Sequence, residues 1–163
     1  IYLHLKSVMM RYRLLSKEEL EPLQEEFLKY LLVANITPDN WKKLKHNNPI
    51  ESQQHLETFS DLILDKILSG VNYVDVVLTN RVEVYHFMKE QVSMFCLENK
   101  VLDTFDFKQT EWSAIDISTA HLIQAKKTYA KERNKEVFDI LQKKHAFISN
   151  GSLYKRMALI SVE

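Results

Sequence analysis

The strongest hydrophobic pattern in the chain lies between Pro49 and Gly70. Apolar residues recur there at spacings of three and four, which places them on one side of a helix. The residues on this side are Leu56, Phe59, Ile63 and Ile67, and Leu62, Leu64 and Leu68 widen it. Pro49 suits the first helical position, and Gly70 suits the left-handed conformation that ends many helices. The pattern predicts one long helix that several neighbouring elements bury.

Two shorter helices are predicted before this one. Ser16 is a good helix cap, because Glu19 follows three residues later and completes a capping box. Pro22 conflicts with an unbroken helix. Either the first turn is separate and the helix proper begins near Pro22, or the helix kinks there. The second helix begins at the Thr37–Pro38 pair, which combines a capping residue with a proline at the first helical position, and it ends before Pro49.

After Gly70 the pattern changes to that of strands. The segment 71–78 is rich in β-branched residues, and the segments 81–88 and 91–97 alternate between two sets of side chains. Thr79-Asn80 and Lys89-Glu90 are the expected turns, so the pattern predicts two or three antiparallel strands. The segment 101–107 is a candidate for one more strand, and 108–116 is expected to be a connection.

The last third of the chain is predicted to be helical. Asp116 or Ser118 can cap a helix that runs through residues 122–125, and a second helical run covers residues 131–144. The Asn150-Gly151 pair leaves two alternatives. It is either a hairpin turn, for which Asn-Gly is a strong signal, or it precedes a short helix over residues 153–160, which we favour.

These elements predict an α+β fold. It comprises an N-terminal three-helix cluster, a small antiparallel sheet of two to four strands, and C-terminal helices. A length of 163 residues favours a single domain spanning residues 1–163. The chain begins with Ile1, and Met9 or Met10 offers a natural start. Residues 1–9 are therefore expected to be a disordered or non-native extension.

Composition narrows the function classes. The chain has two glycines, which argues against glycine-rich phosphate-binding loops. Cys96 is the single cysteine, so the chain has no internal disulfide and no cysteine-based zinc cluster. A reducing compartment follows most simply, and no segment approaches the length of a membrane span. We expect a cytoplasmic protein that does not associate with a membrane and binds no metal or cofactor.

Several short segments of the chain resemble the corresponding segments of a family of small uncharacterised bacterial proteins. The segments are 11–19 (RYRLLSKEE), 59–62 (FSDL), 131–134 (KERN), 136–141 (EVFDIL) and 150–154 (NGSLY). The similarity runs from about Met10 to the C-terminus. That family has a Tyr-Leu-Glu-His string after the long helix, where this chain has Tyr73-Val74-Asp75-Val76. The resemblance implies a soluble cytoplasmic protein of unknown function, and it transfers no catalytic residue.

Three groups of side chains are candidates for chemistry. Glu57, Asp61 and Asp65 form an acidic strip on the long helix, but a carboxylate metal site would add a Glu-x-x-His unit that this chain lacks. A solvated face is the favoured interpretation, and Asp61 is a candidate partner for Arg11 or Arg13. His86 and Cys96 both fall on plausible inward strand faces. A nucleophile pair would need a third, orienting residue, and none is evident.

The third group is a basic tract, Lys126, Lys127, Tyr129, Lys131 and Arg133, in a C-terminal region (residues 118–163) with 9 basic and 4 acidic side chains. Such a tract can follow phosphates while the tyrosine stacks on a base. Interleaved acidic residues are also typical of an exposed, ion-paired helix. We therefore favour a non-catalytic protein–protein interaction or accessory domain, or a self-associating protein. The alternative is a nucleic-acid-associated protein, and a small hydrolase or metal-dependent enzyme ranks third.

Overall fold

The computed structural model describes residues 9–99 and 120–161. Contacts within the chain group into two compact units, one up to Ile67 and one from Leu68 onward, which are described separately below. The expectation of a single domain stays a prediction. The candidate strand 101–107, the connection 108–116 and residues 1–8 of the expected extension lie outside the described residues.

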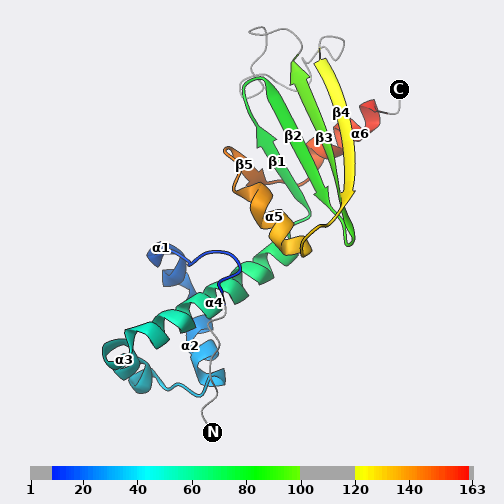
Figure 1. Ribbon diagram of the computed structural model, residues 1–163. Coiled ribbons are helices and arrows are strands. Elements are labelled where there is room, and N and C mark those ends of the chain that lie inside the picture. Colours follow the sequence, from blue (N-terminus) through cyan, green and yellow to red (C-terminus); the bar gives the residue numbers. More distant parts are fainter. Residues whose placement is uncertain (1–8, 100–119, 162–163) are drawn as a thin grey trace. The chain divides into compact units, whose positions relative to one another are not determined.

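The first unit is helical (Figure 1). Its elements are α1 (Lys17–Leu20), the 3-10 turn η1 (Glu21–Leu23), α2 (Gln24–Val33), α3 (Pro38–Asn47) and most of α4 (Pro49–Ser69). Pro22 lies in η1, so the first of the two alternatives is confirmed: the first turn is separate, and the longer helix begins just after it at Gln24. No helix in the described residues is both long enough and apolar enough to cross a membrane.

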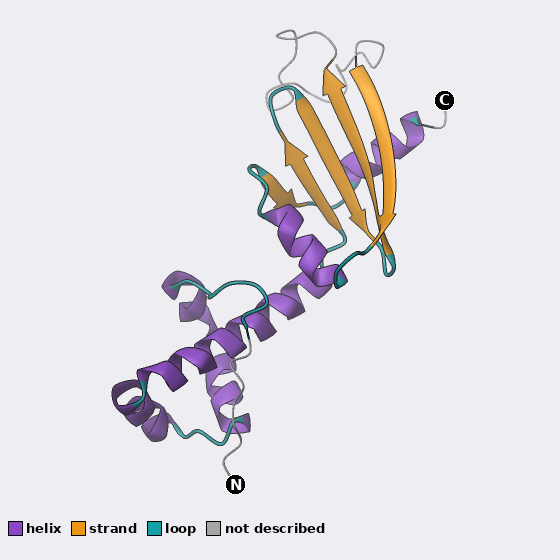
Figure 2. Cartoon of the chain, in the orientation of Figure 1, coloured by secondary structure: helices purple, strands orange, loops and turns teal. Residues whose placement is uncertain are grey.

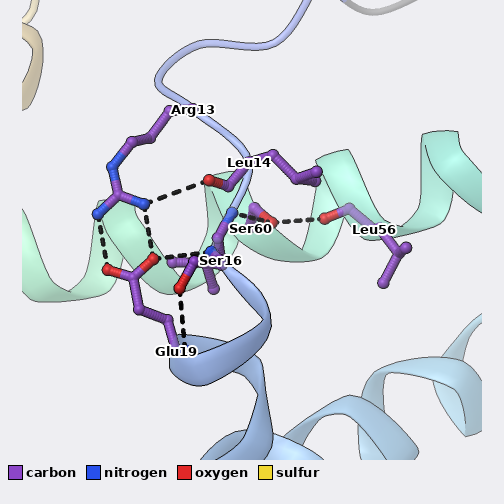
Figure 3. Close-up of polar contacts among 7 residues, drawn as sticks. Arg13, Leu14, Ser16, Glu19, Leu56 and Ser60 are labelled. Carbon is purple, nitrogen blue, oxygen red and sulfur yellow. Dashed lines mark hydrogen bonds and ion pairs between the residues drawn. The ribbon is translucent and has the colours of Figure 1, made fainter.

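The chain entering α1 is anchored to α4 (Figure 3). Ser16 caps α1, because its Oγ accepts a hydrogen bond from the Glu19 amide while the Glu19 carboxylate accepts one from the Ser16 amide. Ser60 is fully buried in α4; its Oγ accepts a bond from the Leu15 amide at 3.1 Å and donates one to the Leu56 carbonyl at 2.7 Å. The predicted capping box is confirmed, and it works together with a contact across 45 residues of sequence.

The long helix α4 is less buried than the width of its apolar side predicts. Phe59 and Leu64 are buried, but Leu62 is 56% exposed and Ile67 is 51% exposed. The expectation of burial on most sides was therefore wrong for these two positions. The described helices α1 to α3 cover one side of α4, and periodicity alone does not reveal how many neighbours a helix has.

The second unit is a five-stranded antiparallel sheet with two helices (Figure 2). The strands are β1 (Tyr73–Val77), β2 (Arg81–Phe87), β3 (Gln91–Asn99), β4 (Ala120–Thr128) and β5 (Ala146–Ile148), in the spatial order β4-β3-β2-β1-β5. The helices are α5 (Arg133–Leu141) and α6 (Ser152–Ile160). The α+β class and the three strands of the first sheet region are confirmed, and so are both predicted turns.

Two strands were not expected. Residues 120–128 form β4 rather than the predicted helix, and the segment 146–148 adds β5, so the sheet has five strands instead of two to four. β4 pairs with β3 along its whole length, from Gln91–Thr128 to Asn99–Ala120. This long-range pairing decides the conformation, because local helix propensity is a weak preference that tertiary contacts override.

The two helices of this unit pack on opposite faces of the sheet, so β2 and β3 are buried on both sides. On one face Met157 of α6 packs with Val82, Val84 and Phe95. On the other face Val137 of α5 is fully buried. The consequence is that residues of both alternating sets in β2 lie in the interior, including polar ones.

The helical alternative after Asn150-Gly151 is confirmed. Gly151 has φ +78°, a left-handed conformation that a residue with a side chain adopts only with strain. A Cβ at this position would also lie 2.6 Å from Cδ2 of Tyr73. Gly151 is therefore the last residue of the connection between β5 and α6, and it allows α6 to begin directly against the ring of Tyr73.

Candidate functional site

An open groove in the helical unit has a volume of about 520 Å³. Residues from α1, η1, α2, α3 and α4 line it, namely Lys17, Leu20, Glu21, Gln24, Phe27, Trp41, Lys45 and Leu56. Its apolar side chains come from four separate helical segments that the short connections of this unit bring together. This volume is within the range of pockets that hold a small ligand or an anchoring side chain.

The wall of the groove is an interlocked aromatic cluster. Phe27 meets Trp41 edge-on, with ring centroids 5.2 Å apart, and it meets Phe59 edge-on at 5.0 Å. The Tyr30 hydroxyl lies 2.9 Å from Nδ1 of His55, which fixes both rings beside this cluster. Burial raises the pKa of Tyr30, so the hydroxyl keeps its proton. Because these side chains are already held in place, little conformational entropy is lost when a ligand binds against them.

The rim of the groove is charged. Lys17 and Lys45 contribute ammonium groups and Glu21 contributes a carboxylate. Among the described residues, no carboxylate lies within ion-pair distance of either lysine. An apolar floor beside two available cations suits a ligand that has an apolar body and a carboxylate.

The acidic strip on α4 instead anchors the start of the chain. Asp61 accepts hydrogen bonds from the backbone amides of Arg11 at 2.7 Å and Tyr12 at 3.0 Å. Asp65 accepts one from the Tyr12 hydroxyl at 2.7 Å, and the Arg11 guanidinium lies 3.7 Å away. The proposed pairing of Asp61 with Arg11 is thus made through the backbone. Arg13 pairs with Glu19 at 2.7 Å.

Glu57, the third residue of the strip, accepts a bond from Gln53 at 3.3 Å. The described residues contain no group of three or more histidine, cysteine, aspartate or glutamate side chains that could hold a metal ion. The strip in this structure therefore positions the chain that leads into α1 and stabilises the helical unit.

His86 and Cys96 lie on opposite faces of the sheet. His86 is paired with Ser93, and Cys96 is paired with Glu83, in a register that alternates the faces. Both faces of the sheet are inward faces, because α6 covers one and α5 covers the other. The two side chains are therefore kept apart by the sheet and do not form a nucleophile pair. Burial raises the pKa of Cys96 to about 11, so its thiol is protonated and is a poor nucleophile.

His86 is part of an aromatic stack under α6. Its ring stacks on Tyr73 with a centroid distance of 4.5 Å and meets the ring of Tyr154 edge-on at 5.2 Å. Burial, together with the nearby Lys155 charge, lowers the pKa of His86. The Tyr154 hydroxyl donates to Ser93 at 2.8 Å, and Ser93 is fully buried. These contacts are those of a packed interface between helix and sheet.

An ionic cluster around the buried Glu83 carboxylate was not anticipated from the sequence. The Glu83 carboxylate accepts hydrogen bonds from the Lys143 ammonium at 2.6 Å and from the Tyr85 hydroxyl, and Arg81 Nε lies 2.9 Å away. Burial alone would raise the pKa of Glu83, but the bonds from Lys143 and Tyr85 lower it overall. The only sequence signal is a charged residue inside an otherwise apolar strand. The cluster ties the turn that follows α5 to β2.

Most of the basic tract is engaged in contacts within the chain. The Arg133 guanidinium donates to four backbone carbonyls, those of Leu68, Val71, Phe87 and Met88. The Tyr129 hydroxyl lies 2.7 Å from the Met88 carbonyl. Lys127 pairs with Glu136 at 2.9 Å, and Lys131 pairs with Asp139 at 2.8 Å. Lys126 is the exposed member without such a contact among the described residues.

The comparisons with known proteins agree with the resemblance seen in the sequence. DUF6495, a family of unknown function, matches residues 10–161. No curated protein and no solved structure is detectably similar to the chain. Because the match covers nearly the whole chain, the protein is a member of the DUF6495 family of unknown function.

Proposed function

We propose that the protein is a non-catalytic interaction protein, and that the groove of its helical unit holds an apolar side chain from an acidic segment of a partner protein. The observation that carries the proposal is the groove itself, with Leu20, Phe27, Trp41 and Leu56 as its apolar lining and lysines at its rim. Aromatic pockets that hold one anchoring side chain supply much of the affinity of many protein interfaces.

A protein segment fits this surface better than a small ligand does. The helix that contributes Phe27 also exposes Leu28 and Leu32, which are 45% and 62% exposed and lie four and eight residues after the groove residue Gln24, on the same side of the helix. Apolar exposure therefore continues along α2 beyond the groove. Extended apolar surface with a charged rim is typical of an interaction site between proteins.

Reversing the rim charges tests the proposal without disturbing the core. The variant Lys17→Glu/Lys45→Glu changes two groove lysines, and the matched control Lys29→Glu/Lys43→Glu changes two lysines outside the groove. Tagged wild-type protein and both variants are used to recover partners from the source cells, with quantification by mass spectrometry. We expect a stoichiometric partner with wild type and control, and at least about a tenfold loss with the groove variant, since like charges across an interface cost several kcal/mol.

Recovery of the same partner by all three proteins would contradict the proposal, and so would recovery of none. The nucleic-acid alternative predicts a different result. Retention on a polyanion column would fall steeply with salt and would weaken in Lys126→Ala/Lys127→Ala. Only Lys126 of the tract is without an intramolecular contact among the described residues, so the groove has the stronger support.

A further inference from the structure

Among the described residues, the outer edge of β4 is long, regular and unpaired. β4 is the last strand of the sheet, and in the described parts of the chain only β3 pairs with it. Seven of its nine residues are exposed, and they include residues on both faces of the sheet. The opposite edge strand, β5, has only three residues. A nine-residue edge presents a row of backbone amides and carbonyls to which another strand can pair.

The edge also lacks the usual protection against such pairing. Its sequence, AHLIQAKKT, has no proline, and its register with β3 continues without a bulge across all nine residues. Its charged lysines lie at one end, and Lys127 is already paired with Glu136. Native proteins normally interrupt long edges with prolines, bulges or central charges. The central part of β4, from Leu122 to Ala125, has none of these.

The sequence of β4 is compatible with pairing to itself. In an antiparallel pair centred on Gln124, all nine residues are matched, and Ile123 faces Ala125 of the second copy twice. Both positions are exposed in the single chain, with Ile123 37% exposed. Two apolar cross-strand pairs would then meet at the centre of the contact, which is a favourable arrangement.

The position of Lys126 favours this register over one that is shifted toward the lysines. With Gln124 at the centre, Lys126 faces Leu122 of the second copy, and the two Lys126 side chains are separated by four residues, about 14 Å along the strand. This distance exceeds the screening length of about 8 Å at physiological ionic strength. A register centred two residues later would place Lys126 directly opposite its counterpart, where like charges are destabilising.

We propose that a second copy of this chain pairs antiparallel with β4 about a two-fold axis at Gln124, so that the two five-stranded sheets become one continuous sheet. The occupant of the edge is thus the chain itself. This surface lies in the sheet unit and shares no residue with the groove, so the two proposals stand or fall separately.

Charge exchange on β4 tests the pairing. The variants Ile123→Lys/Ala125→Lys and Ile123→Glu/Ala125→Glu place like charges opposite each other in the homodimer and opposite charges together in a mixture. Sedimentation equilibrium is expected to give twice the chain mass of 19.3 kDa for wild type. Each variant alone is expected to weaken dimerisation at least about a hundredfold, and an equimolar mixture is expected to restore the dimer.

A control with the same charge change uses two exposed positions off this edge, Phe147→Lys/Leu159→Lys, one of them on β5. It is expected to dimerise as wild type does. Circular dichroism of every variant checks that the fold is kept, and the recovery of dimer in the mixture shows directly that both charged variants are folded. The proposal would be overturned if wild-type protein stays monomeric up to 100 micromolar, which is the result expected if the edge of β4 binds a different partner. Dimerisation of the charged variants alone, a mixture that stays monomeric, or a control that loses the dimer would overturn it as well.

Discussion

Arg133 is predicted to stabilise the sheet unit rather than to bind an external anion. Its guanidinium reaches four backbone carbonyls at distances of 2.5 Å to Val71 and 3.2 Å to Leu68, Phe87 and Met88. These carbonyls belong to the last turn of α4, to the segment that enters β1, and to the end of β2 with the residue that follows it. A planar group with five donors matches such a fan of acceptors, which the single ammonium of lysine does not.

The cost of removing this side chain can be worked from those bonds. A hydrogen bond from a charged donor contributes about 1.5–3 kcal/mol when it is well protected. Arg133 is half-buried, so water replaces part of each lost bond. We therefore expect Arg133→Ala to lower the free energy of unfolding by about 3 kcal/mol in total, and Arg133→Lys by about half as much. For a chain of this size that loss lowers the Tm by roughly 6–12 °C.

Urea and thermal unfolding followed by circular dichroism measure this effect, and an unchanged m value shows that the same surface unfolds. Lys126→Ala is the matched control, because Lys126 is exposed and is expected to change stability by less than about 0.5 kcal/mol. If Arg133→Ala unfolds like wild type while its retention on a polyanion column falls, the structural role is refuted and the anion-binding role of the basic tract is favoured.

Three further predictions concern single side chains. Gly151→Ala is expected to lower the free energy of unfolding by about 2–4 kcal/mol in urea titrations, because φ is +78° and the new Cβ would meet the ring of Tyr73; a loss below about 0.5 kcal/mol would contradict the packing. Glu83→Gln is expected to lower the free energy of unfolding by about 1–2 kcal/mol near pH 7, because it removes the carboxylate that pairs with the Lys143 ammonium, which is 41% exposed and is partly solvated by water. The folded-state pKa of Glu83 is lowered from 4.5, so its stabilisation is complete above pH 4.5 and is lost as the pH falls through the lower folded-state pKa. Because Glu83→Gln has no carboxylate to protonate at this position, its free energy of unfolding should fall less than that of wild type as the pH is lowered. The same dependence of stability on pH in both proteins would count against the cluster. Glu19 is expected to titrate at about 2 by carbon-13 NMR, mainly because Arg13 donates to it; Arg13→Ala should raise this pKa but leave it below 4.5, since the capping bond remains, and an unaltered titration would exclude the pair.

The helical unit was predictable where signals are local. The caps at Ser16 and Thr37 each need only a side-chain oxygen and an amide three residues later, and both formed as predicted. The interruption at Pro22 follows from its missing amide. What the sequence does not contain is how the helices assemble. The groove exists because side chains such as Leu20 and Trp41 approach from separate helices, and periodicity identifies the apolar face of each helix without showing the space between them.

The sheet unit shows a second limit. Alternation predicted β2 and β3, because successive side chains of a strand point to opposite faces of the sheet and the two sets differ in character. The segment of β4 was interpreted as a helix because Asp116 or Ser118 can cap one and apolar residues follow. Most of β4 is exposed on both faces, so its sequence has little alternation to indicate a strand. The Glu83 cluster was missed because its partners, Tyr85 and Lys143, are separated from one another by 58 residues and meet only in the fold.

The central claim is that the groove of the helical unit is the binding site, and site-specific photo-cross-linking tests it most directly. A benzoylphenylalanine in place of Gln24 lies at the groove, and the same residue in place of Lys29 lies on the same helix outside the groove. We predict that irradiation in the source cells yields one major adduct at Gln24, that the adduct maps to an acidic segment of the partner, and that Lys17→Glu/Lys45→Glu abolishes it. No adduct at Gln24, or equal yields at Gln24 and Lys29, would contradict the account.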